Sequence, residues 1–82
     1  MNKFKFSVKV LPRDVILDTA GRAVEHTLAE HQLPTLSCRI GRYIEIEVEA
    51  ESEKTAFQKI EQMAKLVLHN PLIEKYEIGK IQ

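Results

Sequence analysis

The stretch that decides the fold is CRIGRYIEIEVEAE, residues 38–51, in which apolar and polar side chains alternate. This alternation is typical of a strand with one buried face. Arg42 interrupts the apolar side and stands next to Gly41. The interruption predicts either a three-residue hairpin loop at 41–43 or one long strand that bends at Gly41. The apolar side consists of Cys38, Ile40, Ile44, Ile46 and Val48.

The register of the apolar positions limits the form of the turn. A two-residue loop would pair residues 40 and 43 and would move the following apolar side chains to the opposite face. The apolar positions stay even on both sides of Gly41, so this tight turn is excluded. Both remaining arrangements place Arg42 at an exposed corner. The pattern is compatible with a sheet of three or of four strands.

Two elements precede this stretch. The segment KFKFSVKVL, residues 3–11, alternates in the same way and predicts a half-buried strand. Asp18 is the predicted N-cap of a helix over residues 19–31, because the apolar residues that follow it have helical spacing. Leu33-Pro34 closes this helix, since a residue before proline is biased away from the helical region.

Two elements follow it. The apolar residues between Ser52 and Asn70 fit an amphipathic helix, with Ser52 as N-cap and Asn70 as a left-handed stop before Pro71. The segment IEKYEIGKI, residues 73–81, predicts a short last strand whose inward pair is Tyr76 and Ile78.

The element order predicts the fold class. Residues 1–82 contain no linker or internal repeat and form one predicted domain. Helices that connect strands and carry one apolar stripe each pack on one face of the sheet. We therefore expect an α+β two-layer sandwich of ferredoxin-like type, β-α-β(β)-α-β, with an antiparallel sheet and both helices on one face. Opposite charges suited to cross-strand pairing support this topology: Lys3, Lys5 and Lys9 against Glu45, Glu47 and Glu49.

The composition limits the possible partners. The 82 residues include 12 basic and 12 acidic ones, so no net charge attracts nucleic acid or an anionic membrane. Tyr43 is the one aromatic residue expected on the exposed sheet face, which ranks RNA recognition last. A core this small commonly recruits a partner subunit. With one cysteine and no apolar segment of signal or membrane length, the expected location is the cytoplasm.

Reactive groups are not arranged in any known catalytic pattern. The sequence has no paired acids, no Ser/His/Asp grouping and no phosphate-binding loop, and its single cysteine and three histidines lack metal-ligand spacing. Cys38 lies on the apolar side of its stretch and is expected to be a small core residue. We therefore predict no catalytic, cofactor-binding or metal-binding residue in this chain.

Three motifs together resemble a known family. VILDTAGRAV before and in the first helix, CRIGRYIEIEVE, and LHNPLIEKYEI are similar in order and spacing to the PurS family, the small subunits of phosphoribosylformylglycinamidine (FGAM) synthase. The resemblance extends from about Val8 to Ile78. Four positions depart from the family pattern: Thr19 replaces a proline, Ala20 a glutamine, Arg42 a lysine and His69 an alanine.

The resemblance implies a function that the residue patterns do not supply. It implies a non-catalytic subunit that bridges a glutaminase subunit and a large synthetase subunit and assists ammonia transfer in purine biosynthesis. It also implies a homodimer or a dimer of dimers, with ATP, magnesium and glutamine used by the partner subunits. The alternative is a small-molecule-sensing regulatory module, since domains of this fold have diverse functions.

Two groups of site residues follow. The candidate partner-interface residues are Arg39, Gly41, Arg42, Tyr43, Asn70 and Pro71. Asp18 and Gly21 are expected to have structural roles, the first as a helix cap and the second in helix packing.

Overall fold

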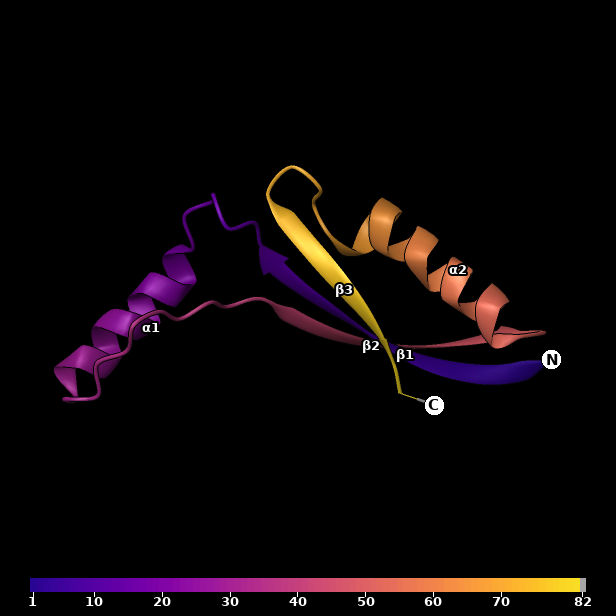
Figure 1. Cartoon of the computed structure of the whole chain (residues 1–82), viewed down its shortest axis with the longest axis horizontal. Coiled ribbons are helices and arrows are strands. Elements are labelled where there is room, and N and C mark those ends of the chain that lie inside the picture. The colour runs from indigo at the N-terminus through magenta and orange to yellow at the C-terminus, as the bar shows by residue number, and fades with distance from the viewer. Residues whose placement is uncertain (82) are drawn as a thin grey trace.

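The computed structural model of the chain describes residues 1–81, in which three strands and two helices follow the predicted order (Figure 1). The second helix ends in a π-helical turn, η1. The elements are β1 (Asn2–Pro12), α1 (Thr19–Glu30), β2 (Arg42–Ala50), α2 (Glu53–Met63), η1 (Ala64–Leu68) and β3 (Glu74–Lys80).

The sheet is antiparallel, and β1 lies at its centre in the order β2-β1-β3. Val8 pairs with Ile44 on one side and with Ile78 on the other. The apolar positions of the three strands therefore share one face, as their parity predicts. Tyr76 and Ile78 pack against the core from β3, which confirms the predicted inward pair.

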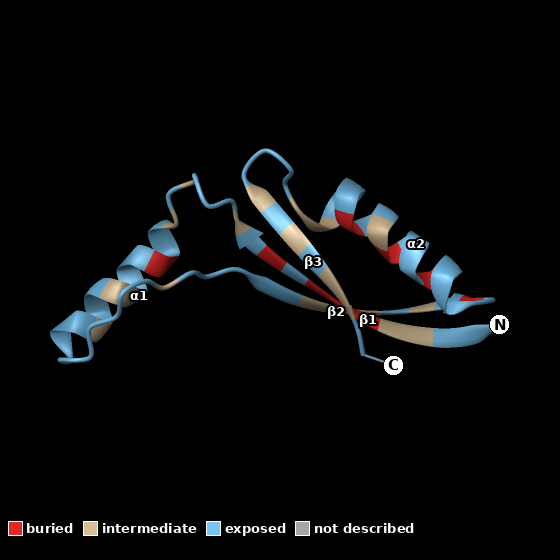
Figure 2. Cartoon of the chain, in the orientation of Figure 1, coloured by how far each residue is buried: buried red, intermediate tan, exposed pale blue. Residues whose placement is uncertain are grey.

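The core lies between this face and α2, which crosses the sheet (Figure 2). Phe57 on α2 meets Phe6 edge to face, with ring centroids 6.2 Å apart. The opposite face of the sheet is largely polar and open to solvent. The fully covered apolar residues are Phe6, Val8, Val10, Ala50, Ala56, Ile60 and Ala64.

The predicted charge complementarity is present on the open face for two of the three lysines. Lys3 lies opposite Glu49 and Lys5 opposite Glu47. Lys5 forms its ion pair diagonally, 3.5 Å from Glu45. The third lysine, Lys9, lies between a tyrosine on β2 and a glutamate on β3.

The sheet has three strands within the described part of the chain, which answers the question of the turn. Residues 37–41 are irregular and β2 begins at Arg42, so neither a hairpin loop at 41–43 nor a strand through Cys38 is present. A side chain at Gly41 would overlap the carbonyl oxygen of Val10, and its φ is not positive. Gly41 is therefore a point of close backbone approach.

The placement of α1 differs from the expectation. Whereas α2 covers the sheet, α1 extends away from it, and the molecule measures 52 × 25 × 15 Å (Figure 1). Only Gly21 of α1 is buried, because the helix is held against the irregular segment before β2 and not against the sheet. Its apolar stripe contains mainly small side chains and offers little area for packing. No helix within residues 1–81 is long and apolar enough to cross a membrane.

The helix caps are mostly as predicted, with one error. Asp18 and Ser52 each accept a hydrogen bond from a first-turn N–H. The left-handed residue is not Asn70 but Gln32, at the end of α1, with a φ of 64°. Asn70 is not needed as a stop, because His69 already has extended backbone after η1. The Asn70 side chain instead accepts a hydrogen bond from the Leu72 N–H at 3.0 Å.

Gly41→Ala tests the close approach at Val10. Because the new methyl group would overlap a backbone carbonyl, we expect the free energy of unfolding to fall by about 1 to 3 kcal/mol, as for overpacked cores. Gly79→Ala is the matched control, since its methyl group would meet only the rotatable Ser7 hydroxyl at 3.0 Å. Urea unfolding followed by circular dichroism measures both. Equal stability of Gly41→Ala and wild type would contradict the close approach.

Candidate functional site

The six candidate interface residues lie close to one end of the sheet, where β1 ends and where β2 and β3 begin. Three of them, Arg39, Arg42 and Asn70, belong to two polar clusters. We call the first the corner; it consists of Arg42, Leu68, Asn70 and Glu74. We call the second the junction; it joins α1 to the irregular segment through Asp18, Gly21, Glu25, Cys38, Arg39 and Ile40.

Arg42 holds the corner together. Its guanidinium donates to both carboxylate oxygens of Glu74, at 2.8 and 3.0 Å, and to the backbone oxygen of Leu68 at 3.0 Å. Strand β1 separates β2 from β3, so this side chain reaches across the central strand. The Arg42 side chain is 52% exposed, whereas that of Glu74 is 15% exposed.

The corner explains why a charge stands on the apolar side of β2. Arg42 pairs with Val10, and Glu74 pairs with Pro12, so both face the side of the sheet that α2 and η1 cover. Leu68 is the last residue of η1, and its backbone oxygen has no partner within the helix. A cation at a helix C-terminus is favoured by the helix dipole. Arg42 thus donates a hydrogen bond to a backbone oxygen at the end of η1 that would otherwise have no partner in the helix.

The charges of the corner are mutually stabilised. The hydrogen bond from Arg42 lowers the pKa of Glu74, and the backbone N–H of Asn70, which donates at 2.8 Å, lowers it further. The same contact with Glu74 raises the pKa of Arg42. Arg42 is therefore exposed, as expected, but its guanidinium is held by contacts within the chain.

The other candidates near the corner differ in how firmly they are held. Pro71 accepts two hydrogen bonds from the Arg13 guanidinium through its backbone oxygen, at 2.6 and 3.0 Å. Tyr43 is 58% exposed on the open face and donates to Glu45 at 3.1 Å. Desolvation, followed by the contact with Glu45, raises the pKa of Tyr43. The Tyr43 ring is therefore available to a partner on the open face.

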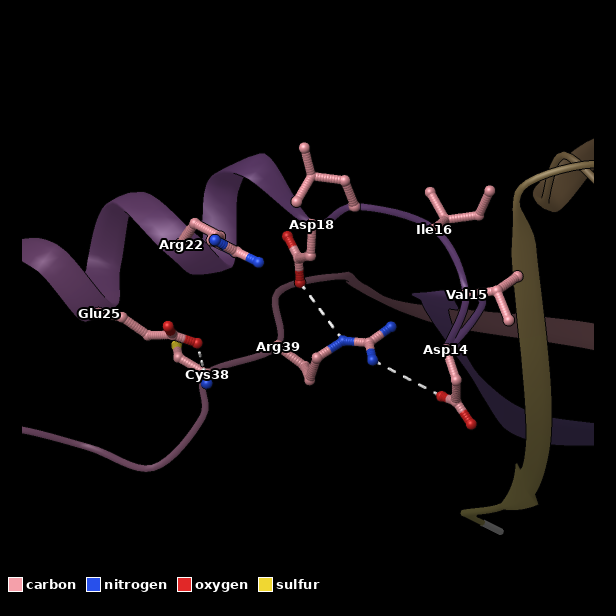
Figure 3. A pocket seen from close by; sticks show the side chains of 9 residues that line it. Asp14, Val15, Ile16, Asp18, Arg22, Glu25, Cys38 and Arg39 are labelled. Carbon is pink, nitrogen blue, oxygen red and sulfur yellow. Dashed lines mark hydrogen bonds and ion pairs between the residues drawn. The ribbon is translucent and has the colours of Figure 1, made fainter.

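Asp18 is the centre of the junction (Figure 3). One carboxylate oxygen accepts from the Gly21 N–H at 2.8 Å and the other from the Ile40 N–H at 2.9 Å. These two bonds, in this order, lower the pKa of Asp18. A single carboxylate therefore caps α1 and fixes the segment that leads into β2.

Arg39 joins the same cluster to the end of β1. Its guanidinium donates to the backbone oxygen of Pro12 at 2.5 Å and lies 3.5 Å from Asp18 and 3.6 Å from Asp14. Asp14 also pairs with Lys75 on β3 at 3.0 Å, and this hydrogen bond lowers the pKa of Asp14. The candidate Arg39 thus links the irregular segment before β2 to the end of β1 and, through Asp14 and Asp18, to the segment between β1 and α1.

Two contacts bring α1 onto the irregular segment. Glu25 accepts from the Cys38 N–H at 2.7 Å. A side chain at Gly21 would overlap the Cys38 carbonyl oxygen, so glycine is required for this approach and its predicted packing role is confirmed. Cys38 is half-buried beside α1 and is not a core residue of the sheet, contrary to the expectation from its parity.

Several residues in these clusters or in contact with their neighbours were not found from the sequence. They are Arg13, Asp14, Glu25, Glu74 and Lys75, whose partners are mostly more than ten residues away. A charge on the apolar side of a strand is the only sequence signal among them, and it applies to Glu74 as it does to Arg42. Within residues 1–81, no group of three or more acidic, histidine or cysteine side chains is arranged to hold a metal ion.

Comparisons with known proteins agree with this fold. A PurS family model, described as phosphoribosylformylglycinamidine (FGAM) synthase, matches residues 5–82. The PurS subunit of this synthase from Thermotoga maritima is 34% identical over 82 residues, which cover 99% of this chain and 100% of that protein. The PurS subunit from Synechocystis sp. is 40% identical over 70 residues, 84% of this chain and 70% of that protein.

A solved structure gives the same result. A chain in the structure of PurLQS from Thermotoga maritima has a TM-score of 0.92 and 33% identity, covering 99% of this chain and 100% of that chain. The fold and these matches define the class, a small α+β subunit of a multi-subunit ligase. The chain belongs to the PurS family of FGAM synthase subunits, which confirms the resemblance seen in its motifs.

Asp18→Asn tests the junction. The pKa of Asp18 is lowered in the fold, so its contribution to stability is present above the ordinary aspartate pKa and is lost as the pH falls through the lower folded value. We expect the variant to be less stable than wild type at pH 7 and this difference to shrink below about pH 4.

Asp14→Asn is the matched control, because Asp14 is 78% exposed and is paired with side chains alone. We expect it to lose less stability at pH 7. Urea unfolding at pH 7 and at about pH 3 measures both differences. A gap between wild type and Asp18→Asn that is constant over this range would contradict the ionised cap.

Proposed function

We propose that this chain is a non-catalytic subunit that bridges the glutaminase and synthetase subunits of FGAM synthase and assists ammonia transfer between them. The observation that carries the proposal is the elongated shape, 52 × 25 × 15 Å, in which α1 projects from the sheet (Figure 1). An extended molecule can contact two partners at separate places. In this proposal ATP, magnesium and glutamine are bound by the partner subunits, and the complex works in the cytoplasm.

Exposed apolar side chains support two separate contact regions. One region follows α1, where Leu33 is 61% and Leu36 is fully exposed. The other lies around η1, where Leu66, Val67 and Leu72 are between 73% and 82% exposed. Large apolar side chains that remain uncovered in a small chain are typical of surfaces buried on assembly.

Assembly with itself is part of the proposal. Both β2 and β3 are edge strands, and their unpaired backbone groups favour pairing with another chain. We propose a homodimer or a dimer of dimers within the complex. The match to a chain of PurLQS from Thermotoga maritima supports association with two further kinds of subunit.

The isolated chain should turn over neither glutamine nor ATP, because it has no catalytic grouping in its sequence. Glutamate release and ADP formation are the two measurements. Addition of the chain to the glutaminase and synthetase subunits should restore glutamine-dependent activity. Ammonia-dependent activity of the synthetase should not require it. Turnover that coelutes with the purified chain, or no effect of the chain on glutamine-dependent activity, would refute the proposal.

Arg42→Ala tests an interface role of the corner separately from its structural role. The substitution removes a forked ion pair that is half exposed, so we expect it to lower the free energy of unfolding by about 1 kcal/mol. Glu74→Gln is the matched control, since it weakens the same pair but leaves the guanidinium in place. If Arg42 also binds a partner, Arg42→Ala lowers glutamine-dependent activity at limiting subunit concentration more than Glu74→Gln does. Equal activities would restrict Arg42 to its structural role.

A further inference from the structure

A cavity of about 340 Å³ lies between α1, the segment before it and the irregular segment before β2 (Figure 3). Its volume is at the lower end of the range for ligand sites and suits a small metabolite. Part of the junction borders the cavity. The side chain of Arg22, which is not a member of the junction, borders it as well. Its charged lining residues are Asp14, Asp18, Arg22, Glu25 and Arg39.

Much of the hydrogen-bonding capacity of this lining is already used by the fold. Both oxygens of Asp18 accept backbone N–H groups. Oε2 of Glu25 accepts from Cys38, and Oδ1 of Asp14 accepts from Lys75. Nη2 of Arg39 donates to the backbone of β1. These bonds hold the walls of the cavity together.

The remaining groups include both donors and acceptors. Arg22 forms no hydrogen bond or ion pair with the other lining residues (Figure 3). Nε and Nη1 of Arg39 lie 3.5 and 3.6 Å from the nearest carboxylates, too far for good hydrogen bonds. The second oxygens of Glu25 and Asp14 receive no hydrogen bond from residues 1–81. The open space is therefore bordered by the free guanidinium of Arg22, by Arg39, which forms ion pairs with two carboxylates but no short hydrogen bond to them, and by free carboxylate oxygens.

This combination selects against a simple anion. The lining contains three carboxylates and two guanidiniums, so a phosphate would meet net repulsion. A molecule with both a carboxylate and an ammonium group would satisfy both kinds of free group. Arg22 and Glu25 are three residues apart on α1, which places them on the same side of the helix.

We propose that this cavity binds a free α-amino acid, whose carboxylate contacts Arg22 and Arg39 and whose ammonium group contacts Glu25. Charge-assisted hydrogen bonds at both ends of the ligand give the site its selectivity. This site lies at the junction and is separate from the corner.

The test is a titration of the full chain with L-glutamine and with glycine, followed by amide chemical shifts. We expect the amides of Arg22, Glu25 and Cys38 to shift, because these residues border the cavity. N-acetyl-L-glutamine lacks the ammonium group and glycinamide lacks the carboxylate. Each should bind at least about tenfold more weakly than its parent, because a hydrogen bond to a charged group is lost.

Variants separate this site from general charge effects. Arg22→Gln and Glu25→Gln should each weaken binding at least about tenfold. Lys54→Gln is the matched control for Arg22→Gln, because it removes one charge from an exposed position near the start of the other helix. It should leave binding unchanged. If Arg22→Gln fails to fold, the two modified ligands still test the proposal on the wild-type chain.

Three results would overturn the proposal. The first is the absence of shifts with either amino acid up to about 10 mM. The second is binding of inorganic phosphate in place of the amino acids. The third is an equal loss of affinity in Lys54→Gln and Arg22→Gln.

Discussion

The two-sided pairing of β1 is the constraint on which the rest of the structure depends. β2 and β3 pair only with β1 among the described strands, so its alternation decides which of their side chains face α2. Phe6, Val8 and Val10 are at most 1% exposed because they have neighbours on both sides and a helix above. A shift of β1 by one residue would move its own apolar side chains to the opposite face, away from α2.

Where the alternation is broken, the broken position makes a tertiary contact. Arg42 and Glu74 are charged residues on the apolar side of their strands, and both lie beneath the end of η1. Their charges are tolerated there because each satisfies the other and because Arg42 also binds a helix-terminal carbonyl. The hydrogen bond from Arg42 to Leu68 also holds η1 over the end of the sheet, beyond the apolar residues of α2.

The sequence allowed prediction of those features that local rules determine. Alternation predicted the three strands and the face that each one buries, apart from the start of β2, and Asp18 and Ser52 predicted the helix starts, since a cap acts within one turn. The placement of α1 was wrong because it depends on Glu25 and Gly21 meeting Cys38, more than ten residues away. The junction could not be found for the same reason. Asn70 was assigned a left-handed stop because nothing in the sequence indicated the π-helical turn before it.

The junction connects this arrangement to assembly. If α1 lay on the sheet beside α2, its few large apolar side chains would be covered within the chain. The bonds of Asp18 and Glu25 to the irregular segment hold α1 away from the sheet, which leaves Leu33 and Leu36 beyond it in solvent. A monomer loses apolar burial by this arrangement. In the proposed assembly a partner that covers these side chains would recover this loss and stabilise the fold.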